Sequence, residues 1–290
     1  MTHESLTVGD IELTALLDGD RELDGSIEDM FPGVPAEELE AFRDQAPGSY
    51  GPGGGWRLRV RAWLLRHDGG LILIDTGIGQ QGAPAPGWFG APGRLHEALA
   101  GIGVTPGDID TVAISHVHDD HIGGTVMFSD VGVPVPAFPN ARYVLQRADR
   151  DWQFQLAESE QEDRTIGDLL LRPLEKAAQL DLIEGEHPLA EGITLHHLPG
   201  HTPGHQVVRI GSGDARALIS ADAFNHPIQL GHPEWPSGPD ASVEGAETAR
   251  RTLLRELASE PGTVVAPTHF AEAFGHIRSG ADGLAAWQPI

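Results

Sequence analysis

The segment His116-Val117-His118-Asp119-Asp120-His121 comes directly after an apolar run, Thr111 to Ser115, that is typical of a buried strand. Four of its side chains can bind a metal ion: His116, His118, Asp120 and His121. In an extended loop side chains alternate, so the first three of these should point to one side, with His121 just past the turn. Imidazole and carboxylate suit zinc or another divalent first-row metal, and four such ligands would crowd one tetrahedral ion. The segment therefore favours two adjacent metal ions over a polar loop of solvated histidines.

Three further potential ligands also follow expected strands. His201 stands in a tight Pro/Gly turn, whereas Asp222 and His269 come just after short apolar runs. Ligands at the carboxyl ends of strands are the usual arrangement in proteins that combine helices with a sheet. The seven residues therefore share one kind of placement along the chain.

The composition excludes several classes of protein. The chain has 290 residues, 40% of them hydrophobic, and a formal net charge of −24. This charge argues against nucleic acid and against anionic lipid, because a phosphate backbone needs a basic face. The absence of cysteine excludes disulfides, thiolate metal sites and a cysteine nucleophile. We find neither a signal peptide nor a membrane span, so we expect a cytoplasmic protein.

The order of apolar patterns predicts an α/β protein. Strands are expected in two clusters, roughly 8–146 and 193–269, and the segment 71–77 is apolar on both faces, as in a covered sheet. A helical pattern runs from 147 to 180, and 243–259 is a clear amphipathic helix. Two packed sheets with helices outside account for this order, with the strand at 263–266 as the last buried one.

Several other residues have two interpretations. Trp88 and Phe89, in the Gly/Pro-rich segment 80–93, either wall a substrate pocket or pack into the core. His226 either lines the pocket or caps a turn. Asp75 is interpreted as a turn cap in preference to a carboxylate that supports a metal ligand. His205 is expected to support its loop through a hydrogen bond.

The four motifs together resemble the metallo-β-lactamase fold superfamily. Their order is His-x-His-x-Asp-His, then Pro-Gly-His-Thr-x-Gly-His, then Asp-Ala, then a late histidine, and the resemblance runs from Asp75-Thr76-Gly77 to His269. It implies a single domain over 1–290, built as an αββα sandwich of two mixed β-sheets flanked by helices. The helical segment at about 147–180 would be an insert in that domain.

The resemblance also implies a division of ligands. His116, His118 and His201 would bind one metal ion, Asp120, His121 and His269 would bind the other, and Asp222 would bridge the two. Both ions would be divalent, with zinc as the first choice and manganese, cobalt or iron as alternatives. A hydroxide held between them would attack an ester carbonyl, and Asp120 would also act catalytically by receiving and passing on the proton.

Within the superfamily, three stretches look like the branch of acyl-homoserine lactonases and methyl-parathion-type organophosphorus hydrolases. They are His201-Thr202-Pro203-Gly204-His205-Gln206, His232-Pro233-Glu234-Trp235 and His269-Phe270. This implies a homodimeric hydrolase of a small-molecule lactone, with Trp88, Phe89, Phe224 and His226 as candidate substrate contacts. A phosphotriesterase or arylesterase is the alternative, because Ala223, Phe224 and Asn225 stand where many lactonases carry a tyrosine. The alternative of another class is a metal-stabilised binding protein without turnover.

Overall fold

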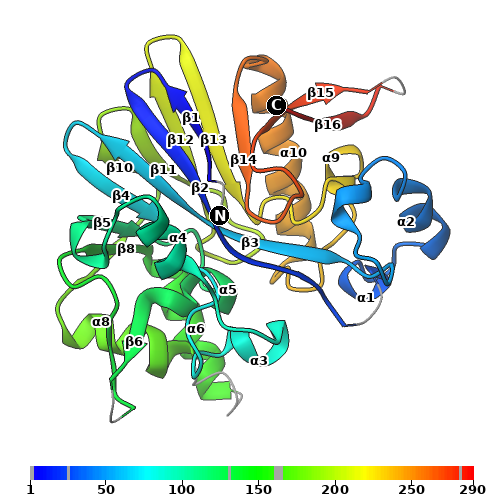
Figure 1. Cartoon of the computed structure of the whole chain (residues 1–290). Helices are drawn as coiled ribbons and strands as arrows, with labels where there is room; N and C mark the ends of the chain where they lie inside the picture. Colours follow the sequence, from blue (N-terminus) through cyan, green and yellow to red (C-terminus); the bar gives the residue numbers. More distant parts are fainter. Residues whose placement is uncertain (1–2, 25–26, 130–131, 160–165, 281–282) are drawn as a thin grey trace.

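Two seven-stranded sheets lie face to face in this computed structural model, which describes residues 3–24, 27–129, 132–159, 166–280 and 283–290 (Figure 1). The first sheet has the order β1 (Glu4–Val8), β2 (Ile11–Glu22), β3 (Arg57–His67), β4 (Gly70–Ile74), β5 (Thr111–Ala113), β8 (Arg142–Gln146) and β9 (Leu180–Ile183). The second has the order β10 (His187–Ala190), β11 (Ile193–His197), β12 (Gln206–Ser212), β13 (Ala215–Ala221), β14 (Val264–Pro267), β15 (Gly275–Ser279) and β16 (Ala285–Pro289). A separate ribbon pairs β6 (Val126–Phe128) with β7 (Pro134–Pro136).

Helices cover the outer face of each sheet. The described residues form the helices α1 (Ile27–Met30), α2 (Ala36–Phe42), α3 (Ala85–Phe89), α4 (Leu95–Gly101), α5 (Asp119–Ile122), α6 (Arg147–Ser159), α8 (Arg172–Lys176), α9 (Ile228–Gly231) and α10 (Val243–Ser259), of which only some lie on a sheet face. A π-helical turn, Gly167–Leu171, leads into α8. Helices α4 and α8 pack on the first sheet and α10 on the second, which confirms the αββα architecture.

Alternation along the strands builds these layers. In β3, the side chains of Ala62 and Leu64 join the core beneath α4, whereas those of Trp63 and Leu65 face the second sheet. Successive strand side chains point to opposite faces, so a strand that is apolar throughout is covered on both sides. The apolar segment expected at 71–77 forms β4 only as far as Ile74, and that strand is buried in this way.

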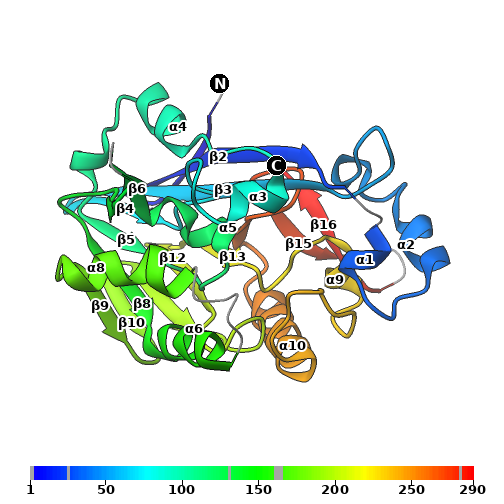
Figure 2. The ribbon, with the colours of Figure 1, turned by 90° about the horizontal axis from the view of Figure 1, so that it is seen from below.

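Both sheets are mixed, and this brings several strand ends to one edge. Strands β4, β5, β8 and β9 run parallel, as do β13 and β14. The carboxyl ends of β5, β13 and β14 lie at the same edge of the sandwich, near α5 (Figure 2). The ligand-bearing loops leave the sheets at this edge.

The expected elements agree with the structure except in two places: strands β9 and β10 lie between the two expected strand clusters, and the chain differs again near the C-terminus. The amphipathic helix expected at 243–259 is α10, whose cap residue Ser242 accepts a hydrogen bond from the Gly245 backbone at 3.0 Å. The segment 147–180 holds α6, the π-helical turn and α8, and its residues 160–165 lie outside the described residues. Strand β14 is followed by the hairpin β15–β16, which the sequence analysis missed because few of its side chains are buried. No helix in the described ranges combines the length and apolar character that crossing a bilayer requires.

Candidate metal centre

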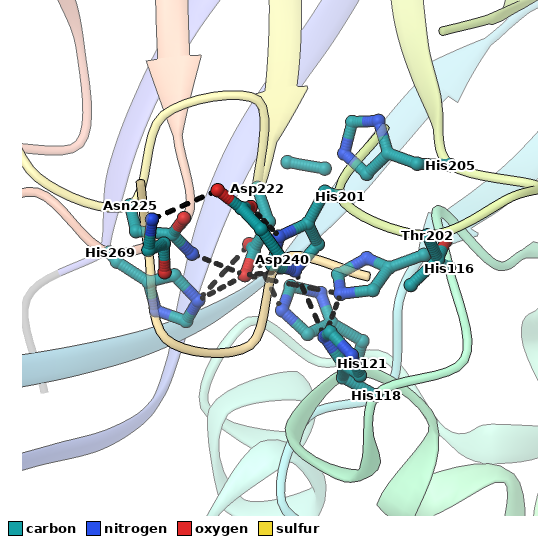
Figure 3. Close-up of polar contacts among 12 residues, drawn as sticks. His116, His118, His121, His201, Thr202, His205, Asp222, Asn225, Asp240 and His269 are labelled. Carbon is teal, nitrogen blue, oxygen red and sulfur yellow. Dashed lines mark hydrogen bonds and ion pairs between the residues drawn. The ribbon is translucent and has the colours of Figure 1, made fainter. Parts of the chain in front are cut away.

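The seven candidate ligands gather at this edge in two adjacent groups. The first ligand group is His116, His118, His201 and Asp222, and the second ligand group is Asp120, His121 and His269. Within each group the potential ligand atoms lie within 4.8 Å of one another. Figure 3 shows the imidazole rings turned toward one another, with Asp222 lying between His269 and the other histidines.

The backbone after β5 separates the two groups. We expected an extended loop through Asp120, but α5 begins at Asp119, so Asp120 and His121 stand in a helical turn. This corrects the expected alternation beyond His118. The change from extended to helical backbone brings Asp120 and His121 into the group with His269, although the ring centroids of His116 and His121 still lie 4.0 Å apart. One short motif therefore supplies ligands to both groups.

In the first ligand group the ring nitrogens converge on His118. Its Nδ1 lies 3.0 Å from Nε2 of His116 and 2.9 Å from Nε2 of His201. The carboxylate of Asp222 completes the group, with Oδ2 at 3.3 Å from Nε2 of His201 and 3.9 Å from Nε2 of His116.

The second ligand group meets the other oxygen of Asp222. Oδ1 lies 3.1 Å from Nε2 of His121 and 3.1 Å from Nε2 of His269. Oδ2 of Asp120 lies 3.8 Å from the first of these nitrogens and 3.7 Å from the second. Nε2 of His269 also lies 3.2 Å from Oδ2, so the carboxylate of Asp222 stands between the two groups and contacts both, as a bridging carboxylate would.

The remote ring nitrogens fix the tautomers of three histidines. Nδ1 of His121 faces Oδ2 of Asp75 at 2.8 Å, that of His201 faces Oδ1 of Asp240 at 2.8 Å, and that of His269 faces a backbone carbonyl at 2.6 Å. All three partners are acceptors, so Nδ1 carries the proton and Nε2 presents a lone pair.

These lone pairs point at a carboxylate, which provides the test of whether metal ions fit. Two acceptors in contact repel unless a cation lies between them. Nε2 of His121 and Oδ1 of Asp222 are both buried without a hydrogen-bond partner. This is expected of atoms whose partner is a metal ion. Nitrogen and oxygen donors in two sets around one shared carboxylate suit divalent ions such as zinc. The residues present therefore fit a dinuclear site.

Electrostatics in the cluster draw positive charge toward Asp222. Burial lowers the pKa of His201, but hydrogen bonds with Asp222 and Asp240 outweigh it and raise that pKa to about 9. Burial likewise opposes protonation of His121, yet Asp222 and Asp120 hold its pKa well above the usual range. The pKa values of His116 and His118 are well below it, because both are buried beside other histidines. Protons or metal ions must balance the carboxylates here.

Asp75 supports the site, which corrects its interpretation as only a turn cap. Its carboxylate accepts hydrogen bonds at 2.7 Å from the backbone N–H and at 2.7 Å from the hydroxyl of Ser115, besides facing His121. Asp75 has φ 60°, and Ala221, next to Asp222, has φ 43°. Left-handed backbone costs an L-residue about 1–3 kcal/mol and persists where packing enforces it, commonly at functional sites.

Of the four candidate substrate contacts, only Trp88 presents surface to solvent. Its side chain is 47% exposed, and its indole N–H donates to Oδ2 of Asp119 at 2.9 Å, which places it beside the metal-binding motif. Phe89 and Phe224 are buried in apolar cores. His226 is buried too, and its Nδ1 accepts the Ile228 N–H at 3.2 Å, so it caps a turn. Its ring is surrounded by four aromatic side chains: Phe31, Phe42, Tyr50 and Trp56.

Sequence reasoning missed three polar residues that support the ligands. Asp240 faces His201, and Asn225 donates from Nδ2 to Oδ2 of Asp222 at 2.7 Å. Asp149 accepts hydrogen bonds from the loop after β5, through Val117, and from the loop that carries His201, through Thr202 and Gly204. Asp149 follows β8 at the edge where β5 ends, so its place after a strand was a usable signal. Asp240 stands in a loop with no comparable pattern. His205, by contrast, donates from Nδ1 to the Leu198 carbonyl at 3.1 Å, which confirms its expected loop-supporting role.

Comparison with known proteins places this site in a family. The sequence profile of the metallo-beta-lactamase superfamily matches residues 55–269, which include all seven candidate ligands. The chain belongs to the metallo-beta-lactamase superfamily.

Relatives and solved structures refine that likeness. An N-acyl homoserine lactonase from a Bacillus species is 28% identical over 204 residues, covering 66% of this chain and 74% of the relative. AidC, a dizinc quorum-quenching lactonase solved with a product, has a TM-score of 0.83 at 24% identity, over 99% of this chain and 97% of AidC. The hydrolase AbOPH has a TM-score of 0.83 at 22% identity, over 99% and 97% of the two chains. At these identities, the solved structures show that the fold is shared.

Proposed function

We propose that this protein is a dinuclear-metal-dependent hydrolase that opens lactones of the N-acyl homoserine type. The observation that carries the proposal is Asp222, whose two oxygens face histidine nitrogens of both ligand groups at 3.1–3.3 Å. The lactonase relative and the dizinc fold neighbour support the choice of substrate and metal. Zinc is the first choice, and manganese, cobalt and iron remain alternatives for the same nitrogen and oxygen donors.

In this proposal each side chain has a stated task. His116, His118 and His201 hold one ion, His121, His269 and Asp120 hold the other, and Asp222 joins both. Two such ions supply an activated water and polarise the ester carbonyl. When the water oxygen bonds to the carbonyl carbon the water gives up a proton, and when the ring C–O bond breaks the leaving alkoxide takes that proton up to become an alcohol. Asp120 presents Oδ2 to the histidines, so its other oxygen, Oδ1, is the atom proposed to carry that proton.

The test is a substrate screen with metal control. Purified protein is assayed on N-acyl homoserine lactones, aryl esters, phosphotriesters, β-lactams and glutathione thioesters, before chelation, after it, and after add-back of zinc, manganese or cobalt. We expect lactone hydrolysis that disappears with the metal and returns with it, and none in Asp222→Ala. Hydrolysis confined to β-lactams or thioesters would contradict the proposal. Metal binding without any turnover would favour the binding-protein alternative.

Phosphotriesters are the second candidate substrates because of Asn225. This residue lies three positions after Asp222, in the region where many lactonases carry a tyrosine, and its amide is engaged by Asp222. A site without that hydroxyl donor has one group fewer to hold a lactone carbonyl. A kcat/KM for phosphotriesters above that for every lactone in the screen would decide for this second candidate.

A cytoplasmic location and a homodimer are part of the proposal. They rest on the sequence features and the branch resemblance described above. Cell fractionation tests the location, and light scattering during size-exclusion chromatography tests the assembly, with a mass twice that of one 30.9 kDa chain expected.

A further inference from the structure

One buried carboxylate contacts both loops that carry the histidines of the first ligand group. Asp149 stands in the first turn of α6, and its side chain is shielded from solvent. Oδ2 accepts hydrogen bonds from the Val117 backbone N–H at 3.1 Å and from the Thr202 hydroxyl at 2.9 Å. Oδ1 accepts the Gly204 backbone N–H at 2.5 Å.

The donors are neighbours of the ligands in the sequence. Val117 lies between His116 and His118, and Thr202 follows His201 directly. Two loops about 80 residues apart in the chain are therefore held by a single side chain, where Nδ1 of His118 and Nε2 of His201 lie 2.9 Å apart. A loop that carries a ligand needs such fixed points, because outer contacts orient metal ligands.

The local chain accommodates this contact closely. A Cβ on Gly204 would lie 2.7 Å from Cγ and 2.7 Å from the backbone nitrogen of Asp149, so only glycine allows the approach. The N-terminal turn of α6 also favours a negative charge, because the first N–H groups of a helix are unpaired. Helix α6 belongs to the segment 147–180, so the insert takes part in shaping the site.

We propose that Asp149 is a positioning residue that sets the spacing of His118 and His201 and thereby retains the ion of the first ligand group. The inference rests on the proposed two-metal site. It assigns the helical insert a task in metal retention that a role in packing alone would not include.

Asp149→Asn is the informative substitution. The side chain keeps its size, but one of its two acceptor oxygens becomes an NH₂ group that faces a donor. At least one of the three hydrogen bonds is then replaced by a repulsive contact. We expect the two loops to move apart and the first ion to be released more readily.

Asp18→Asn is the matched control. Asp18 is another buried carboxylate that accepts two backbone N–H groups, from Ile78 at 2.7 Å and from Leu95 at 2.6 Å. Burial raises its pKa to about 6, as it does for Asp149, but the loops it holds carry none of the seven ligands. The same substitution thus tests a buried carboxylate clamp on loops that carry none of the histidines of the first ligand group.

The measurement is the release of zinc from the full-length proteins to a coloured chelator, with thermal unfolding recorded alongside. The wild type should release two ions per chain. In Asp149→Asn we expect one of the two to leave at least about tenfold faster, the range seen when outer contacts of ligands are lost. Asp18→Asn should unfold at a lower temperature yet release both ions at the wild-type rates.

Contrary outcomes are distinguishable. Wild-type rates for both ions in Asp149→Asn, or equal acceleration in both variants, would overturn the role of Asp149. A wild type that binds fewer than two ions would instead overturn the proposed function. If Asp149→Asn fails to fold, Gly204→Ala decides, because its new methyl group pushes on the same contact and should accelerate release of one ion. Unchanged release in that variant would also refute the inference.

Discussion

The two ligand groups differ in what holds them. The first is supported mainly from the second half of the chain, where Asp149 on α6 accepts hydrogen bonds from its loops. Nδ1 of His201 donates to Asp240, and Arg250 of α10 forms an ion pair with Asp240 at 3.2 Å. The Asp240 and Arg250 side chains are both buried. A charged pair removed from water requires well-formed geometry, so it fixes the His201 ring firmly.

The second ligand group is supported from the first half of the chain. Nδ1 of His121 donates to the carboxylate of Asp75, just after β4, and Nδ1 of His269 donates to the backbone carbonyl of Arg59 in β3. Arg61, also on β3 and buried, donates to three carbonyls of the loop that carries His269: Thr268 at 3.1 Å, Phe270 at 2.6 Å and Ala271 at 2.8 Å. Arg61 therefore holds its loop by donating to backbone carbonyls, whereas Asp149 holds its two loops mainly by accepting from backbone N–H groups.

This difference suggests that the two ions can be lost separately. Each group has supports that the other does not use, but the segment after β5 serves both: it carries ligands of each group, and the Ser115 hydroxyl contacts His116 at 3.0 Å and Asp75 at 2.7 Å. Asp222 is the one ligand that contacts both groups. Substitutions in the supports should therefore act on one ion, and substitutions of Asp222 should act on both.

The largest effect is expected from Asp222→Ala. Removing the shared carboxylate leaves histidine nitrogens of both groups without their common partner. The affinity for both ions should fall by more than about 100-fold, because losing a direct ligand costs more than losing a residue that only orients a ligand. Elemental analysis after dialysis and lactone hydrolysis measure the two consequences. Retention of one tightly bound ion would show that Asp222 serves a single group.

The next effect is the pH dependence of metal binding. His201 has a pKa raised to about 9, so below that pH its imidazole is protonated, and an ion must displace the proton to bind. The affinity should fall as the pH falls below about 9, by about tenfold per pH unit for each proton displaced. Calorimetry in buffers of different ionisation enthalpy measures the protons released. An affinity that is constant from pH 6 to pH 8 would contradict this account.

Arg61→Lys should lower the affinity for the ion of the second ligand group by about tenfold and leave the affinity for the ion of the first group unchanged. Lysine keeps the charge, but its single ammonium cannot match the planar guanidinium that contacts three carbonyls. The zinc-release assay applied to Asp149→Asn gives the comparison directly. Loss of the same ion in the two variants would remove the distinction between the ligand groups.

The sequence predicted the metal ligands better than their supports, for a physical reason. His116 to His121, His201, Asp222 and His269 stand in dense motifs just after apolar runs, so local pattern locates them. Asp240 and Arg61 act through contacts between segments far apart in the chain, which no local spacing encodes. The helical turn that separates Asp120 and His121 from His118 was missed because α5 is only four residues long.

Pocket residues were the least predictable from sequence. Phe89 and Phe224 lie on segments that resemble pocket loops, yet both side chains are buried in apolar cores. An aromatic side chain in a Gly/Pro-rich segment is compatible with either placement, because burial depends on what the rest of the chain brings over it. Trp88, its neighbour, differs by pointing outward to Asp119.

The smallest effect is expected at Trp88, beside the second ligand group. Trp88→Phe keeps an aromatic surface and removes the N–H that holds Asp119. A single hydrogen bond at a partly exposed site contributes about 1 kcal/mol, so KM for a lactone should rise by about fivefold at most with kcat little changed. Trp88→Ala should raise KM further. Equal kinetics in all three proteins would exclude Trp88 from the substrate site.

Seven side chains are proposed to form two metal sites that share Asp222. Anomalous diffraction from zinc-loaded crystals, recorded on both sides of the zinc absorption edge, tests this claim most directly. We predict two peaks: one among His116, His118 and His201, the other among Asp120, His121 and His269, with Asp222 contacting both. A single peak, or a second one away from these residues, would contradict the claim.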